Sequence, residues 1–340
     1  MIESVEFHNF KSLRNTTLPL SRFTLIVGPN GSGKSTAMQA IQAAGDMEMV
    51  KYHRTATAGL QKDDSNNIEV VIHWGEPYAG AQTHAIWLTG DKRSYLRHND
   101  KRSRDINRRD SIGKALEDTL AAVRIYSFDG QAIAAPSQLK PKATLVPSGA
   151  NLAVVLDRLR DEEPEILEAL NEELGRWLPE FDRILFETPI TGHRAITLRT
   201  REGHHKIPAT ELSQGTLIAI AILTLAYIPD PPPIICIEEP DRGIHPRLLR
   251  DVRDALYRLA YPESVGEKRA PVQVIATTHS PYLLDLFRDH PEEIVIANKI
   301  GQEAGFKRLT DQKNIDEILE DAHLGDIWYT GILGGVPSNT

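Results

Sequence analysis

The sequence predicts an α/β protein in which helices cover a largely parallel sheet. In its second half, short apolar strands alternate with helical segments: IICIE precedes RLLRDVRDALYRLA, and VQVIATTHS precedes YLLDLFRD. This alternation is typical of parallel sheets. Earlier in the chain, IESVEFHNF, NIEVVIHWG and HAIWLTG read as strands, which predicts an N-terminal antiparallel β portion. Residues 151–181 carry apolar side chains at spacings of three and four, so a helical subdomain is expected there.

The composition is that of a globular protein of one large or two ordinary domains, with 340 residues, 41% hydrophobic and 25% charged. The net charge of −8 argues against a generally basic surface that coats nucleic acid. The single cysteine, Cys236, excludes an internal disulfide framework and is interpreted as a small buried hydrophobe. No apolar run is long enough to cross a bilayer, and the first ten residues lack the pattern of a secretory signal. We therefore expect a cytoplasmic protein with no membrane contact.

The strongest motif is GPNGSGKST, residues 28–36, which fits G-x-x-x-x-G-K-[ST]. It lies between an apolar strand, RFTLIVG, and a helical segment, as a phosphate-binding loop requires. Glycines let the backbone wrap a phosphate with its N–H groups pointing inward, Lys34 would contact the β and γ phosphates, and the Ser35 hydroxyl would bind Mg²⁺. The motif predicts a nucleoside triphosphate site, with ATP and Mg²⁺ as ligands. The expected binding residues are Asn30, Gly31, Ser32, Gly33, Lys34, Ser35 and Thr36.

Two adjacent glutamates, Glu238 and Glu239, end the apolar strand IICIE. A buried parallel strand presents its last residues at the carboxyl edge of the sheet, where ligands bind in such folds. We expect Glu238 to meet the coordination shell of Mg²⁺. Glu239 would be the general base that takes a proton from the attacking water.

A histidine, His279, follows a further apolar strand, VQVIATT, at what should be the same edge. Histidine can donate to a γ-phosphate or to the attacking water, so His279 is a candidate catalytic residue. His245 lies in the turn GIHP and is expected only to position that turn.

The stretch LSQGT, residues 212–216, reads as the start of a helix that continues through the apolar run 217–228. Ser213 would be its N-cap residue, whose hydroxyl accepts an orphan backbone N–H. Within one chain this is an ordinary cap.

Taken in their order along the chain, the four motifs resemble those of the ABC-type ATPases, and within them the SMC, RecF and OLD-like branch. The resemblance makes residues 28–35 the Walker A loop, 234–239 the Walker B strand, 240–246 the D-loop region and His279 the switch histidine. It implies a head with a mixed or parallel RecA-like sheet flanked by helices. LSQGT then falls where the family has its signature motif, so Ser213 and Gly215 would bind the γ-phosphate of ATP held by a second copy. The resemblance therefore implies a homodimer formed on ATP.

One residue departs from the family pattern, and some further assignments rest on the resemblance alone. Glu238 stands where Walker B usually has Asp, and its longer side chain would hold Mg²⁺ through water. Gln131 is the candidate Q-loop residue on the metal side, with Gln138 in reserve. We interpret residues 1–340 as a single head. Its expected parts are an N-terminal β-rich lobe with Walker A (1–130), a helical insertion (140–182), a lobe with signature, Walker B and switch His (183–330) and a tail (331–340).

A basic segment, Lys92 to Asp110, collects eight Lys or Arg residues and Tyr95 in an otherwise acidic protein. It is either a DNA-backbone contact, sequence-independent and salt-sensitive, or a solvated hairpin and loop. The sequence leaves both interpretations open.

Three functions are compatible with these motifs. The leading hypothesis is an ATPase head that dimerises on ATP and drives a DNA-related process, DNA repair or antiviral defence, with a partner protein. No TOPRIM-like nuclease region follows the ATPase, so an effector or nuclease would be a separate protein. One alternative is the energising subunit of a membrane transporter, but the SQG signature and the T-H-S-P motif argue against it. The other is a slow nucleotide-gated switch that controls a toxic effector.

Overall fold

The computed structural model describes residues 1–47, 67–88, 94–99, 101–102, 111–312, 315 and 323–331. Its contacts divide the chain into two compact units. The first unit comprises Met1–Ile125, Pro232–Cys236 and Pro271–Thr340, and the second comprises Tyr126–Pro231 and Ile237–Ala270. The predicted division into lobes at 130, 140–182 and 183–330 stays a prediction.

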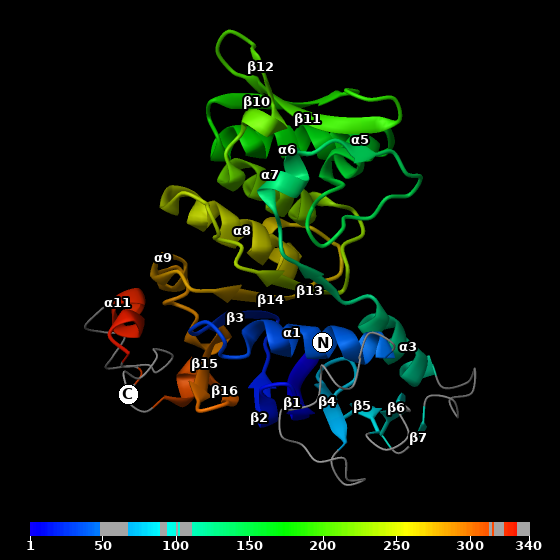
Figure 1. The fold of residues 1–340 in the computed structure, drawn as a ribbon, viewed down its shortest axis with the longest axis vertical. Helices are drawn as coiled ribbons and strands as arrows, with labels where there is room; N and C mark the ends of the chain where they lie inside the picture. Colours follow the sequence, from blue (N-terminus) through cyan, green and yellow to red (C-terminus); the bar gives the residue numbers. More distant parts are fainter. Residues whose placement is uncertain are drawn as a thin grey trace. The chain divides into compact units, whose positions relative to one another are not determined.

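The first unit contains an antiparallel sheet in the order β2-β1-β4-β5-β6-β7 (Figure 1). Its strands alternate between buried apolar and partly exposed polar residues, the pattern of a sheet with one covered face. The expected N-terminal antiparallel portion is therefore confirmed. The strands are β1 (Ile2–Phe10), β2 (Leu13–Pro19), β4 (Ile68–Trp74), β5 (Gln82–Trp87), β6 (Ser94–His98) and β7 (Lys101–Arg102).

A second sheet runs in the order β16-β15-β3-β14-β13-β8. β3 is parallel to both β14 and β15, whereas β15 and β16 form an antiparallel hairpin, so the sheet is mixed. All five residues of β3 and all six of β14 are buried, as expected of central strands covered on both faces. The strands are β3 (Phe23–Val27), β8 (Arg124–Tyr126), β13 (Ile234–Glu238), β14 (Gln273–Thr278), β15 (Ile294–Ile300) and β16 (Glu303–Arg308).

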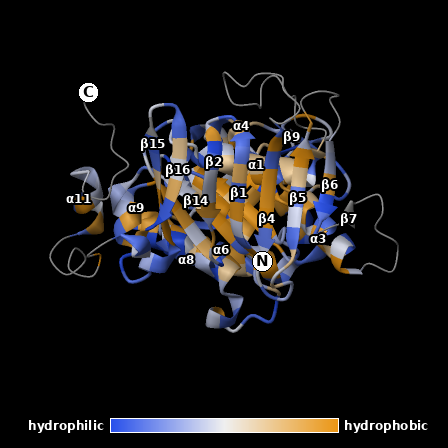
Figure 2. Ribbon diagram, turned by 90° about the horizontal axis from the view of Figure 1, so that it is seen from below, coloured by the Kyte–Doolittle hydropathy of each residue, from blue (hydrophilic) through white to orange (hydrophobic). Residues whose placement is uncertain are grey.

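Helix α1 (Lys34–Gly45) shares one apolar core with both sheets of the first unit. That core joins Phe7 of β1, Ile26 of β3, Met38 of α1 and Trp74 of β4, and it includes the predicted buried hydrophobe Cys236. Figure 2 shows hydrophobic residues along β1 and β4. The remaining helices of this unit are α3 (Ser111–Ala121), α9 (Pro281–Asp285) and α11 (Leu324–Tyr329), with 3₁₀ turns at Pro291–Glu293 and Leu309–Asp311.

The second unit is mainly helical, and its helices 151–177 agree with the expected helical subdomain. α7 is buried on every face from Leu217 to Ala226, as its continuous apolar run predicts. The helices are α4 (Gly130–Ala134), α5 (Leu152–Glu162), α6 (Pro164–Trp177), α7 (Gln214–Tyr227) and α8 (Leu249–Ala260), with 3₁₀ turns at Ala209–Glu211, Pro246–Leu248 and Pro262–Val265. A small antiparallel sheet contains β10 (Phe181–Glu187), β11 (His193–Thr200) and β12 (Lys206–Pro208), and β9 (Ser137–Gln138) also pairs with β11.

Within the described residues, no helix has both the length and the apolar character needed to cross a membrane.

Candidate nucleotide-binding site

The loop from Gly28 to Gly33 joins buried strand β3 directly to helix α1, as the motif predicts. Gly31 and Gly33 have φ values of +74° and +92°, in the left-handed region that side-chain-bearing residues rarely adopt. Left-handed residues in such a turn direct successive backbone N–H groups to one side and create a concave anion site. Gly31 and Gly33 are therefore required by the backbone conformation of the loop.

Lys34, the first residue of α1, has its side chain folded into this loop. Its Nζ donates to the carbonyl oxygens of Gly28 (2.7 Å) and Pro29 (2.9 Å), and the residue is only 6% exposed. The loop therefore holds a buried cation, which favours an anion nearby.

The N-terminus of α1 has no side-chain cap among the described residues, and its first turn has no acidic side chain. Among the described helices, those with a side-chain cap are α4, α7 and α9, capped by Asp129, Ser213 and Ser280, whereas α5, α6, α8 and α11 share the uncapped start of α1. The N–H groups of the first turn and the helix dipole at α1 favour an anionic ligand. Ser35, with an exposed side chain, lies in this first turn.

Ser32 gives a further indication that the loop fits phosphate. Its residue is fully buried, yet its Oγ has no hydrogen-bond partner among the described residues. A buried hydroxyl without a partner costs about 1–3 kcal/mol, and a phosphate oxygen in the loop is a suitable acceptor. No group of three His, Cys, Asp or Glu side chains in the described part of the chain could hold a metal ion by itself. Mg²⁺ is commonly bound by one or two protein groups together with phosphate oxygens and water.

The two glutamates lie at the end of β13, as predicted, and both are half-buried. Glu239 has a φ of +45°, a left-handed conformation that is uncommon for a residue with a side chain. A tight turn follows, in which the N–H of Arg242 donates to the Glu239 carbonyl oxygen (2.9 Å). Such local strain is often found at functional sites. Nothing in the sequence signals it, and the catalytic role of Glu239 and the metal role of Glu238 stay predictions.

His279 directly follows β14, which pairs in parallel with β3 so that Thr278 lies opposite Val27. His279 and Gly28 therefore leave the same edge of this sheet, as the sequence predicts. The next residue, Ser280, caps α9 by accepting the N–H of Leu283 (3.3 Å), and its own N–H donates to Thr278 Oγ1 (2.9 Å). These bonds fix the backbone on both sides of the half-buried His279, whose catalytic role stays a prediction. His245 caps the 3₁₀ turn Pro246–Leu248 by accepting the Arg247 N–H (3.2 Å), which agrees with a positioning role.

The predicted cap at Ser213 is confirmed. Its Oγ accepts the N–H of Thr216 (3.0 Å) and lies 2.9 Å from Thr216 Oγ1, and the Ser213 side chain is exposed. Gly215 is buried: a Cβ atom built there would lie 2.2 Å from the carbonyl oxygen of Gly243. The LSQGT segment is therefore packed tightly against the turn that follows Glu239, inside the second unit.

Gln131 lies at the start of α4, where its N–H donates to Asp129 Oδ1 (2.8 Å) and its side chain is exposed. The preceding Gly130 is close to the signature segment, because a Cβ built on it would lie 3.0 Å from Gln214 Cα. Gln138, the reserve candidate, is exposed in β9. The metal role of Gln131 stays a prediction.

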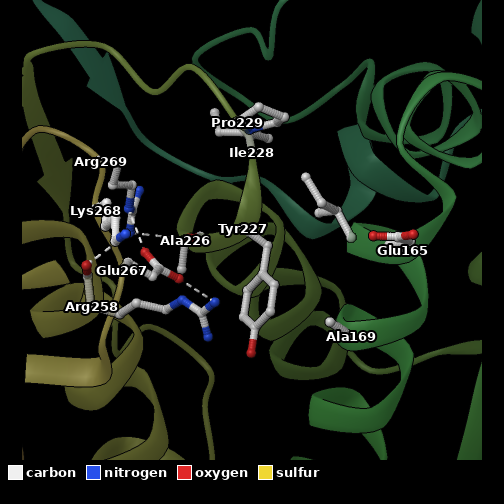
Figure 3. Close-up of a pocket in the computed structure, with 11 residues that line it drawn as sticks. Glu165, Ala169, Ala226, Tyr227, Ile228, Pro229, Arg258, Glu267, Lys268 and Arg269 are labelled. Atoms are coloured by element: carbon white, nitrogen blue, oxygen red, sulfur yellow. Dashed lines mark hydrogen bonds and ion pairs between the residues drawn. The ribbon is translucent and has the colours of Figure 1, made fainter. Parts of the chain in front are cut away.

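A separate cavity of about 390 Å³ lies in the second unit between α6, the end of α7 and α8. Figure 3 shows Arg258, with its guanidinium 3.8 Å from the Tyr227 ring centroid, and Glu267 bridging Arg258 and Arg269. Burial raises the pKa of the Tyr227 phenol. Arg269 also donates to the carbonyl oxygens of Ala226 and Arg258. No predicted site residue lines this cavity, and the charges of Arg258, Glu267 and Arg269 are paired with one another.

Most of the predicted basic segment Lys92–Asp110 lies outside the described residues. Within its described part, Arg97 Nη2 lies 3.3 Å from His84 Nδ1 on the neighbouring strand. The predicted tail from residue 332 onward is also outside the described residues.

Comparison with solved structures places the fold among SMC heads. The chain is similar to a structure described as "Crystal structure of the SmcHead bound to the C-winged helix domain of ScpA", with 19% identity, a TM-score of 0.61 and coverage of 90% of this chain and 96% of that one. It is equally similar to the Smc head domain with an extended coiled coil from Pyrococcus furiosus, with 17% identity, a TM-score of 0.61 and coverage of 94% and 99%. The chain therefore has the fold of an SMC head domain.

Comparison of sequences gives the family. A family described as "AAA domain, putative AbiEii toxin, Type IV TA system" matches residues 80–285, and a second, described as "AAA ATPase domain", matches residues 1–74. The chain belongs to the first of these families. It is also 25% identical to the OLD nuclease of Thermus scotoductus over an alignment of 364 residues, which covers 96% of this chain and 68% of that protein.

The contact of Gly215 with Gly243 predicts that Gly215→Ala destabilises the second unit. The added methyl group must displace backbone rather than a flexible side chain, and overpacking of this kind costs about 1–3 kcal/mol. We expect a lower urea midpoint for unfolding than in the wild type, measured by circular dichroism.

The matched control is Gly175→Ala in α6, where the nearest atom to the new Cβ is the flexible end of Arg201, at 2.8 Å. It should leave stability unchanged or raise it slightly through helix propensity. An unchanged midpoint for Gly215→Ala would contradict the packing described here.

Proposed function

We propose that this chain binds and hydrolyses ATP, dimerises on ATP, and drives a DNA-related process, DNA repair or antiviral defence, with a partner protein. The observation that carries the proposal is the phosphate loop: left-handed glycines, the buried Lys34 ammonium and an uncapped helix N-terminus converge on one short turn. Each of these features separately favours an anion, and together they fit a polyphosphate.

In this proposal the loop N–H groups from Asn30 to Thr36 and Lys34 Nζ bind the phosphates. Lys34 exchanges its bonds with the Gly28 and Pro29 carbonyls for phosphate oxygens, which are stronger acceptors. The Ser35 hydroxyl and the Glu238 carboxylate, with Gln131 as a third candidate, would hold Mg²⁺. When bound, Mg²⁺ neutralises charge on the phosphate oxygens.

Glu239 would accept a proton from the attacking water, and His279 would donate a hydrogen bond to the γ-phosphate. Two observations support these assignments. The backbone of Glu239 is held in a left-handed conformation at a strand end, and His279 leaves the same sheet edge as the phosphate loop. A group held in fixed geometry at a sheet edge is suited to act on a bound ligand.

The signature segment supports the proposed dimer. Ser213 is exposed at the N-terminus of a 14-residue buried helix, so its hydroxyl is accessible to an anion from outside the second unit. In the proposed dimer that anion is the γ-phosphate of ATP bound to the other copy, and Ser213 and Gly215 contact it.

The relatives support a DNA-related role and a partner. One is an OLD nuclease, and one SMC head is bound to a winged helix domain of ScpA. We propose that the partner of this chain is an effector or nuclease protein, and that DNA contact through Lys92–Asp110 contributes to binding.

The wording of the family description favours a second candidate, a slow nucleotide-gated switch that controls a toxic effector. The two candidates differ in turnover. A switch retains ATP for minutes or longer, whereas typical enzymes turn over at about 1–10³ per second. A single-turnover measurement of ATP hydrolysis separates them.

Lys34→Ala should abolish tight ATP binding, because it removes the buried cation from the phosphate loop. Isothermal titration calorimetry with ATP measures this directly. Lys140→Ala, at an exposed site outside the predicted motifs, is the control and should bind as the wild type does. Retention of wild-type affinity by Lys34→Ala would contradict the phosphate-loop assignment.

Glu239→Gln should still bind ATP, but its hydrolysis rate should fall about 10²–10⁴-fold, because this is the usual contribution of a general base to the rate. The amide keeps the size of the side chain and cannot accept the proton. Phosphate release measured with saturating MgATP gives the rate, and calorimetry confirms that binding is kept. Turnover within a few-fold of the wild type would exclude Glu239 as the base.

A further inference from the structure

The hairpin β15–β16 runs beside the phosphate loop in the first unit (Figure 1). β15 pairs in parallel with β3, with Ile296 opposite Val27. β3 ends at Val27, where the loop begins, whereas β15 continues to Ile300. The last residues of β15 therefore extend past the end of β3, along the loop itself.

Two glycines of the loop touch small residues of this hairpin. A Cβ atom built on Gly28 would lie 2.3 Å from the Ala297 carbonyl oxygen, and one built on Gly33 would lie 2.8 Å from Ala304 Cβ. Both distances are shorter than any ordinary contact, so the loop and the hairpin are packed as closely as their backbones allow. The hairpin forms one wall of the loop.

Lys299 lies on the same face of the hairpin as these two alanines. Side chains alternate along a strand, so Ala297 and Lys299 share a face, and Ala304 is the cross-strand neighbour of Lys299. The Lys299 Nζ is 3.8 Å from the position of a Cβ atom built on Gly31, at the tip of the phosphate loop. The strand register and the side-chain position thus agree that Lys299 is directed at the loop.

The Lys299 ammonium has neither an ion-pair nor a hydrogen-bond partner within the described parts of the chain, and the residue is exposed. Lys34, in contrast, is buried and bound to the carbonyls of Gly28 and Pro29. The loop therefore has one cation inside it and, at its tip, a second cation that no described residue neutralises. A second positive charge there increases the attraction for a multiply charged anion more than for a singly charged one.

We propose that Lys299 is a second phosphate-binding cation of this site and that it contacts the β and γ phosphates of the bound nucleotide. The inference rests on the proposed function, since it requires a nucleotide in the phosphate loop. It adds a residue from outside the loop motif, and it gives the hairpin β15–β16 a role in selecting triphosphates and diphosphates over monophosphates.

The test compares Lys299→Ala with Lys307→Ala by calorimetric titration of ATP, ADP and AMP at low and high salt. Lys307 is the matched control, because it is an exposed lysine of the same hairpin on the opposite face, bound to Gln312 (3.1 Å) and paired in register with Ile296. Lys299→Arg keeps the charge and serves as the rescue variant.

Lys299→Ala should weaken ATP and ADP binding by about five- to twenty-fold, the range for a partly exposed charge-assisted contact, and should leave AMP binding nearly unchanged. The loss should shrink at 0.5 M salt, where exposed charges are screened. Lys299→Arg should restore most of the affinity, and Lys307→Ala should match the wild type.

Equal ATP affinity of Lys299→Ala and Lys307→Ala would overturn the inference while leaving the proposed function intact. Equal losses for ATP and AMP would also overturn it, since they would show a general effect on the fold of the hairpin. If the wild type bound no nucleotide, the proposed function itself would fail, and the wild-type titration with ATP identifies that case.

Discussion

The close contact between the phosphate loop and the β15–β16 hairpin is the constraint on which the site depends. Any side chain at Gly28 would collide with the Ala297 carbonyl, and one at Gly33 would collide with Ala304. Because the loop is held this closely, its left-handed residues and the folded side chain of Lys34 are fixed by packing before any ligand arrives. A preorganised anion site loses little conformational freedom on binding.

The second unit has a comparable constraint around the signature segment. Gly215 packs against the carbonyl of Gly243, and Gly130 packs against Gln214, so three segments far apart in sequence meet at the start of α7. One of them is the turn that begins with the strained Glu239. A ligand at Ser213 that shifts the start of α7 would therefore also bear on the turn that holds the proposed base. In the proposed dimer this links the nucleotide of one copy to the proposed general base, Glu239, of the other.

Local sequence patterns predicted the parts of the site that depend on one segment at a time. The spacing of glycines and lysine predicted the loop between β3 and α1, the apolar run predicted buried α7 with its Ser213 cap, and a strand ending in Thr278 predicted the edge position of His279. Features set by tertiary contacts were not predicted. Lys299 follows an ordinary apolar strand, and only the pairing of β15 with β3 brings it to the loop. The left-handed φ of Glu239 likewise has no signal in the sequence, because glutamate has no preference for that conformation.

The central claim is that the ATP site formed by this loop is completed by the LSQGT segment of a second copy. The most direct measurement is the solution mass of the Glu239→Gln protein by light scattering, with and without MgATP. The account predicts a change from 37.9 kDa, the mass of one chain, to twice that value when MgATP is added. A mass that stays at one chain with saturating ATP bound, or a dimer that forms equally without ATP, would contradict it.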